Sequence, residues 1–280
     1  MTASDVPGAP AGLETHRAPD GSPLPDRASP TFERDVQAMF THIVRRYDWF
    51  DHAASMGNDY LWRPRALWDL SRFRAGEPTI QRVLDIGCGT GDLTRLAARY
   101  FPSAQVVGAD FTEAMLHIAD ARTRPESTAS RVGYLRANAR RLPVPSGSFD
   151  VIMSAFVARN LVDLPGVFRE FRRVLRPHGT VLTLEITEPS SPLIGRLFHA
   201  YFDHVVPWLG AAVKSAGPYR YLPNSLRSLP LREGMIRLMQ DAGFPRVEPR
   251  PQSMGIVTTY LAGSEREARG ATGPQGLMSG

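Results

Sequence analysis

The sequence predicts an α/β fold with a doubly wound, mostly parallel sheet of seven strands, N-terminal helices and a helical lid insertion. Apolar runs alternate with helix-like segments from residue 80 onward, and a glycine-rich turn follows the first of these runs. Such alternation is typical of βαβ units and therefore of parallel strands. With 280 residues, 42% of them hydrophobic, the chain can build one domain around a large core.

Two helices are expected ahead of the sheet, over residues 32–50 and 59–73. In the first, Phe32, Val36 and Phe40 recur at helical spacing. The alternating segments that follow are strand 80–86, helix 91–100, strand 105–110, helix 112–122, strand 131–136, strand 149–155, helix 163–175, strand 179–186, helix 231–241 and strands 246–250 and 254–262.

The two ends of the chain and one insertion lie outside this alternation. Residues 1–30 are rich in proline and small residues, so they are expected to be a disordered arm, as is the tail 263–280. The single domain spans 31–262 and contains an insertion at about 191–225, which reads as a packed helical lid or as a helix that completes the core. His199 and His204 within it are interpreted as surface residues.

Composition narrows the classes of function. The net charge of +5 comes almost entirely from arginine, since Lys214 is the only lysine. No basic stripe interleaved with aromatic residues appears, so no nucleic-acid partner is expected. No signal peptide, membrane span or metal-ligand cluster is evident, which favours a cytoplasmic protein without a metal, with peripheral contact to anionic lipid allowed. A homodimer is left open.

The run from Val83 to Asp92 carries the strongest chemical signal. An apolar strand ends near Asp85, and Gly87, Gly89 and Gly91 then let the backbone turn tightly and approach a ligand. A dinucleotide loop needs its third glycine one residue later, to seat a pyrophosphate. The pattern therefore suits a nucleoside without phosphates, and S-adenosylmethionine is the candidate. Asp110 ends the next strand, where a carboxylate can accept hydrogen bonds from ribose hydroxyls.

These motifs resemble those of class I S-adenosylmethionine-dependent methyltransferases, with their Rossmann-like sheet. Ala137–Ala139 and Ser148–Ile152 resemble later motifs of that fold. A narrower resemblance, to the ubiquinone/menaquinone biosynthesis C-methyltransferases, rests on ordered matches over residues 36–245: Met39-Phe40, Arg46-Tyr47-Asp48, Ser55-Met56-Gly57, Leu61-Trp62-Arg63, Ala158-Arg159-Asn160, Arg173 to Gly179, Leu184-Glu185 and Tyr219-Arg220-Tyr221-Leu222.

The resemblance implies a set of cofactor contacts. The residues expected to contact S-adenosylmethionine are Asp85, Gly87, Gly89, Thr90, Asp110, Asn138, Ala139 and Ser154. Asp110 is expected on the ribose diol, with an N-cap to the following helix as its structural alternative. Asn138 and Ala139 are expected at the adenine edge, and Ser154 is as well explained by simple strand termination.

The resemblance also implies where chemistry occurs. Arg159 and Asn160 follow the fourth strand and are expected to be catalytic, while Tyr221 is expected to contact the substrate. Arginine stays protonated in proteins, so Arg159 suits stabilisation of a phenolate or orientation of a water better than proton abstraction. The alternative is that Arg159 only pins its loop through a salt bridge.

The expected reaction is C-methylation of a prenylated quinol ring, either demethylmenaquinol or a ubiquinol precursor. Two alternatives remain: O- or N-methylation of another small molecule or lipid by the same fold, and a non-catalytic relative that only binds the cofactor. The second is kept open by departures from the family pattern, such as Val157-Ala158 where Gly-Leu is usual.

Overall fold

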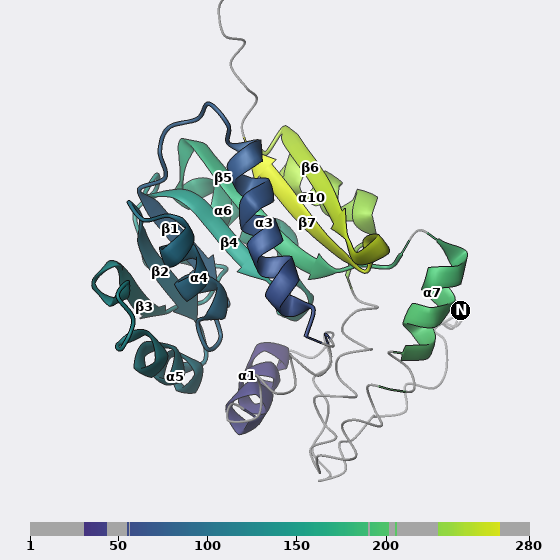
Figure 1. Ribbon diagram of the computed structural model, residues 1–280, viewed down its shortest axis with the longest axis horizontal. Helices are drawn as coiled ribbons and strands as arrows, with labels where there is room; N and C mark the ends of the chain where they lie inside the picture. Colours follow the sequence, from purple (N-terminus) through teal and green to yellow (C-terminus); the bar gives the residue numbers. More distant parts are fainter. Residues whose placement is uncertain are drawn as a thin grey trace, which may run out of the picture.

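The computed structural model describes residues 31–43, 55, 57–189, 191–201, 205 and 229–263. A seven-stranded sheet in the order β3-β2-β1-β4-β5-β7-β6 runs through this part of the chain (Figure 1). Its strands are β1 (Arg82–Ile86), β2 (Gln105–Asp110), β3 (Val132–Arg136), β4 (Phe149–Ala155), β5 (Leu175–Ile186), β6 (Arg246–Gln252) and β7 (Val257–Gly263). The predicted fold class is confirmed.

The order of the strands creates a crevice beside β1. The chain leaves β1 for β2 and β3, returns to β4 on the other side of β1, and all these neighbours pair in parallel. In a doubly wound sheet, ligands bind at the carboxyl ends of the strands where the winding reverses. Only β7 is antiparallel to its neighbours β5 and β6.

Helices cover both faces of the sheet. Figure 1 shows α3 (Asp59–Phe73) and α4 (Asp92–Tyr100) on one face, with α6 (Leu164–Val174) and α10 (Arg232–Asp241) on the other. Strand residues alternate between the two cores: Val83 and Val151 pack with the α3 and α4 side chains, whereas Leu84 and Ile152 pack with those of α6 and α10. This period of two is the ordinary pleat of a strand buried on both sides.

Three further helices frame the sheet. Helix α5 (Glu113–Thr123) lies against β2 and β3, α1 (Phe32–Ile43) stands beyond the sheet, and α7 (Pro192–Ala200) is the described helix of the insertion (Figure 1). The predicted arm 1–30, the tail from 264 onward, most of the lid, His204 and Tyr221 lie outside the described residues.

Two strands begin more than two residues from their predicted starts, each for a local reason. Strand β5 begins at Leu175 rather than residue 179, because Phe149 pairs with Leu175 and Val151 pairs with Thr180. The turn-like residues between them are accommodated as a bulge. Strand β7 begins at Val257 rather than residue 254, because Met254 and Gly255 turn at φ 56° and 90°.

Candidate active site

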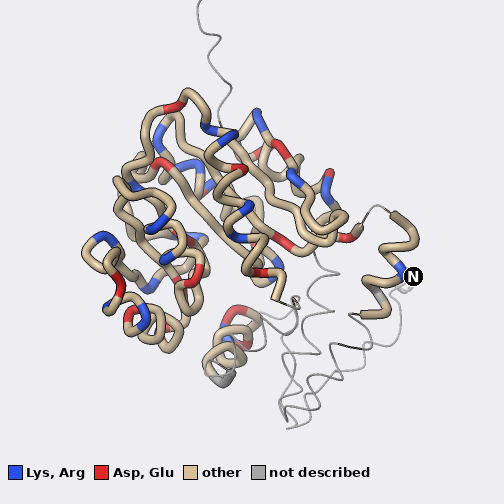
Figure 2. Tube along the Cα trace, in the orientation of Figure 1, with Lys and Arg blue, Asp and Glu red and all other residues tan. Residues whose placement is uncertain are grey.

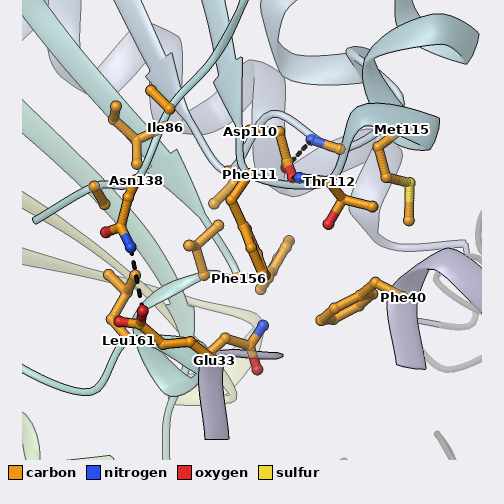
Figure 3. A pocket seen from close by; sticks show the side chains of 17 residues that line it. Glu33, Phe40, Ile86, Asp110, Phe111, Thr112, Met115, Asn138, Phe156 and Leu161 are labelled. Carbon is orange, nitrogen blue, oxygen red and sulfur yellow. Dashed lines mark hydrogen bonds between the residues drawn. The ribbon is translucent and has the colours of Figure 1, made fainter. Parts of the chain in front are cut away.

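The main pocket of the described residues opens at the carboxyl ends of β1, β2 and β4. It is lined by side chains from these strands, from the loops that follow them and from α1 (Figure 3). Ligands of α/β sheets of this kind bind at this edge. Of the predicted residues it brings together Gly87, Gly89, Asp110, Asn138, Ala139 and Asn160.

The glycine loop has the backbone that its sequence predicts. Gly87, Gly89 and Gly91 have φ values of 65°, 52° and 84°, the left-handed region that favours glycine. A Cβ at Gly87 would lie 2.4 Å from Cγ2 of Val157, on the loop that follows β4. The glycine loop therefore packs directly against the turn that carries Arg159 and Asn160.

The Asp110 carboxylate is fixed by hydrogen bonds to the glycine loop and to the residue before α5. One carboxylate oxygen accepts a hydrogen bond from the Gly89 amide at 3.0 Å, and the other accepts from the Thr112 amide at 2.8 Å (Figure 3). Burial raises the pKa of Asp110, while these amide donors oppose the rise. The N-cap of α5 is Thr112 rather than Asp110, so the capping alternative is not what the structure shows. Asp110 instead lines the pocket and bonds to the amide of the capping residue.

Helix α1 closes one side of the pocket. The Asn138 amide donates to Glu33 at 3.2 Å (Figure 3), and the Gln37 amide donates to the Phe111 carbonyl at 2.8 Å. Phe40 also lines the cavity. Amphipathic spacing predicted this helix but not its position. Its place over Asn138 gives this part of the pocket a wall that the motifs alone did not indicate.

A smaller hollow of about 380 Å³ continues on the other side of Gly87 and Gly89. Asp85 and Thr90 line it, together with Arg63 from α3. The Asp85 carboxylate accepts from the Thr94 hydroxyl at 2.6 Å, and burial raises its pKa to about 7, although Thr94 and Arg63 lower it. A carboxylate and a guanidinium side by side match the ammonium and carboxylate of a methionyl group. Arg63 was part of a motif, but no role was predicted for it.

Arg159 and Ser154 are buried behind the main pocket, and neither is among its lining residues. Nη1 of Arg159 lies 3.7 Å from Oε2 of Glu185, and the other oxygen of Glu185 accepts from the Ala158 amide at 2.6 Å. The structure thus contains the ion pair of the salt-bridge alternative. Arg159 is followed directly in the chain by Asn160, which does line the pocket.

Phe156, directly after β4, lines the main pocket. Its backbone has a φ of 61°, a strained value for an aromatic residue, and two guanidinium groups lie near its ring. The Arg63 guanidinium is 5.8 Å from the ring centroid and that of Arg159 is 5.9 Å away. Backbone strain of this kind concentrates at functional sites.

The residues present fit S-adenosylmethionine. A buried carboxylate suits the ribose diol, a side-chain amide suits the adenine edge, and Asp85 with Arg63 suits the methionyl end. No group of three or more His, Cys, Asp or Glu side chains within the described residues could hold a metal ion. The arrangement supports transfer of a methyl group to an acceptor near Phe156 and Asn160.

The comparison with solved structures shows a shared fold. An S-adenosylmethionine-dependent methyltransferase of Thermotoga maritima superposes with a TM-score of 0.54 at 18% identity, covering 81% of this chain and 99% of its own. At that identity the likeness concerns the fold. Together with the family below, it identifies the protein as an S-adenosylmethionine-dependent methyltransferase.

The sequence comparisons place the chain in one family within this class. Residues 29–263 match the model of the ubiE/COQ5 methyltransferase family, and the chain belongs to that family. The demethylmenaquinone methyltransferase of Thermus thermophilus is 40% identical over 74% of this chain and 91% of its own. The ubiquinone/menaquinone biosynthesis C-methyltransferase of Syntrophotalea carbinolica is 35% identical over 81% and 93%.

The contact between Gly87 and Val157 gives a testable expectation. Gly87→Ala should destabilise the protein by about 1–2 kcal/mol through its left-handed backbone, and further through overlap with the stiff Val157 side chain. Gly147→Ala is the matched control, since Gly147 also has φ 65° but nothing within 4 Å. Adding Val157→Ala should remove only the excess over this control in chemical unfolding. Equal losses for the two alanine variants would show that the overlap is relieved without cost.

The two buried carboxylates predict an unusual pH dependence of stability. Burial raises the pKa values of Asp85 and Glu185 to about 7, so between about pH 4 and pH 7 the folded state binds more protons than the unfolded state. Their stabilising contribution is complete below that range and is lost as pH rises through 7. Asp85→Asn and Glu185→Gln should each flatten the fall in melting temperature of the cofactor-free protein between about pH 5 and pH 8. Wild-type slopes in both variants would contradict this assignment.

Proposed function

We propose that the protein transfers a methyl group from S-adenosylmethionine to a ring carbon of a prenylated quinol, either demethylmenaquinol or a ubiquinol precursor. The observation that carries the proposal is the turn with Arg159 and Asn160, which packs against the glycine loop at the inner end of the main pocket. Relatives matched over most of the chain are named for demethylmenaquinone and for ubiquinone/menaquinone biosynthesis, which supports this substrate class.

Four groups of residues would hold the cofactor. Asp110 takes the ribose diol, Asn138 and the Ala139 backbone take the adenine edge, the Gly87–Thr90 loop follows the ribose and methionyl groups, and Asp85 with Arg63 takes the methionyl charges. The bound cofactor supplies an electrophilic methyl group. Ser154 is buried in β4 and in this proposal only supports the strand beneath them.

The chain's own residues must make a ring carbon nucleophilic. A quinol carbon becomes a nucleophile when a neighbouring hydroxyl loses its proton, because phenolate charge spreads to the ortho position. Arg159 lies where it can favour that charge, and its guanidinium stays protonated. Asn160 lines the pocket and can orient the acceptor with its amide. Tyr221 lies outside the described residues, and its contact with the substrate stays a prediction.

The decisive experiment uses purified protein and cofactor with an isotopically labelled methyl group. Demethylmenaquinol and a demethylated benzoquinol are offered separately, and the product is examined by mass spectrometry and NMR. A new methyl resonance on a ring carbon supports the proposal and identifies the ring. A methyl group on oxygen or nitrogen would favour the alternative methyltransferase, and cofactor binding without turnover would favour the non-catalytic relative.

Contact with a lipid surface forms part of this proposal, because a prenylated substrate resides in a membrane. No described helix is long and apolar enough to cross one. On α7, however, Leu193 and Leu197 are 67% and 62% exposed one turn apart, whereas Phe198 is buried. Basic and acidic residues are intermixed along the rest of the described chain (Figure 2). This leucine face is a candidate for shallow insertion.

Vesicle flotation tests that contact. Leu193→Glu combined with Leu197→Glu should reduce binding of the protein to anionic vesicles several-fold, because each change removes buried apolar area and adds repulsion. Tyr100→Glu, at the end of α4, is the control and should bind like the wild type. Unchanged flotation of the double variant would remove α7 from the proposal.

A further inference from the structure

Glu185 is a fully buried carboxylate that the cofactor site does not use. It ends the apolar strand β5 on the face that carries α6 and α10, and its relative exposure is 0%. Oε1 accepts the Ala158 amide hydrogen at 2.6 Å. Oε2 has no hydrogen-bond partner among the described residues. A buried acidic oxygen without a partner costs free energy, which calls for a ligand or a function.

The unpartnered oxygen faces an unpartnered donor. Nη1 of Arg159 is also buried without a hydrogen bond to a described residue, and it lies 3.7 Å from Oε2 of Glu185. That separation is too long for a hydrogen bond. An oxygen atom about 2.8 Å from each would complete a triangle with both, accepting from Arg159 and donating to Glu185. A phenolic hydroxyl has this combination of acceptor and donor.

Glu185 also lines a second cavity. A hollow lies at the carboxyl end of β5, bounded by α10 and β7, and its lining includes Glu185, Met235 and Tyr260. The main pocket is lined by Val157 and Asn160, which belong to the turn that carries Arg159. Glu185 therefore lines the second cavity, while its ion-pair partner Arg159 adjoins a residue that lines the main pocket.

We infer that Glu185 is the proton acceptor for the substrate hydroxyl, with Arg159 holding the phenolate that results. This inference rests on the proposed function and adds to it the identity of the base. Arginine cannot take the proton at neutral pH, whereas a carboxylate can. The buried site raises the pKa of Glu185 to about 7, which is well matched to a base working near neutrality.

The proposed step balances without another reactant. The hydroxyl proton moves to Oε2 of Glu185, and the ring becomes a phenolate. The ortho carbon then forms a bond to the methyl group as the methyl–sulfur bond breaks, with its electron pair remaining on sulfur. The ring carbon next loses its hydrogen as a proton to solvent, and Glu185 returns its proton to the ring oxygen. No oxidant, reductant or metal is consumed.

The charged and titratable groups around Glu185 come from three elements. Arg159 lies on the turn after β4, Tyr260 on β7, and Arg232 with Glu233 at the start of α10. Burial raises the pKa of Tyr260 to about 12, and guanidinium groups do not titrate near pH 7. Glu188, farther along the chain, is exposed. Glu185 is thus the group expected to set a pH dependence near neutrality in the second cavity.

The test is the pH profile of methyl transfer by the full-length protein carrying Glu185→Gln. Glutamine keeps an acceptor for the Ala158 amide but cannot take a proton. We expect kcat to fall about 100-fold or more, with unchanged affinity for S-adenosylmethionine, and the rise in rate with pH through about 7 to disappear. Glu185→Asp should restore part of the rate and the pH dependence.

Asp150→Asn is the matched control. Asp150 is a buried carboxylate at the amino end of β4, bonded to two backbone amides and to Arg176. Its loss should lower the melting temperature without changing the pH profile. A second readout needs no turnover: infrared difference spectra on binding a quinol analogue should show a carboxyl change in the wild type that Glu185→Gln lacks.

The outcomes separate this inference from the proposed function. A wild-type protein that methylates no quinol would contradict the proposed function itself. A wild-type enzyme active on quinol, with a Glu185→Gln variant that keeps the neutral pH dependence or most of its rate, would overturn the role of Glu185 alone. If Glu185→Gln does not fold, Glu185→Asp provides the test. Its shorter side chain should lower kcat and displace the midpoint of the pH profile, and a wild-type rate with an unaltered midpoint would refute the role.

Discussion

Replacing Arg159 with alanine is expected to lower kcat about 100-fold or more while the affinity for S-adenosylmethionine stays close to the wild-type value. The rate falls because one donor to the developing phenolate is lost, and removal of a single such donor typically has this effect. Affinity is retained because Arg159 is not among the residues lining the two cofactor hollows. Steady-state kinetics and calorimetry on the same preparation measure both quantities.

The ion pair with Glu185 requires controls for this variant. Removal of Arg159 leaves a buried carboxylate without its cation, which raises its pKa further and destabilises the fold. Arg159→Lys keeps the charge and should recover only part of the rate, since an ammonium cannot reproduce the planar fork. Full activity of the lysine variant would mean that charge alone matters. Wild-type turnover of Arg159→Ala would refute the role.

A double-mutant cycle then tests whether the two residues act as one unit. Once Glu185→Gln has removed the base, further loss of Arg159 should cost much less than it does in the wild type, because both act on the same hydroxyl. If the two residues acted independently, the fold losses in kcat of the single variants would instead multiply in the double variant. Multiplied losses in kcat would place Arg159 and Glu185 in separate roles, with the ion pair serving the fold alone.

The sheet was predictable because its signals are local. Apolar runs bounded by glycine and polar residues predicted the bounds of β1 to β4 to within two residues. The start of β5 was missed because Pro177 and Gly179 usually end regular structure, and only the pairing of Phe149 with Leu175 shows that the strand continues as a bulge. Register against a neighbour is a tertiary fact that one-dimensional spacing does not contain.

The grouping of the candidate site residues in one pocket was predictable for a related reason. Its residues follow consecutive strands, and parallel topology brings strand ends to one edge. Arg63 and the α1 wall were missed as site residues because they come from helices, whose apolar spacing predicts burial but not the neighbour. Glu185 carried a usable signal: it is an acidic residue at the end of an apolar strand, the same pattern that drew attention to Asp85 and Asp110.

Replacing Asp110 with alanine is expected to weaken S-adenosylmethionine binding by about 2–4 kcal/mol, which corresponds to a dissociation constant about 30 to 1000 times higher. The loss arises because a ribose diol needs charged acceptors in a buried site, and the Gly89 amide also loses its own. Asp110→Asn keeps one acceptor oxygen without the charge and should fall between. Asp120→Asn, an exposed carboxylate on α5 paired with Arg124, is the control.

A ligand that lacks one hydroxyl separates ribose recognition from loop damage. Wild-type protein should bind S-adenosylhomocysteine more tightly than its 2′-deoxy analogue, because the analogue cannot donate to Asp110. Asp110→Ala should bind both alike, since the partner of that hydroxyl has gone. Damage to the loop would weaken both ligands equally and preserve the wild-type preference. A preserved preference in Asp110→Ala would therefore remove the carboxylate from the ribose and leave it only its bonds to Gly89 and Thr112.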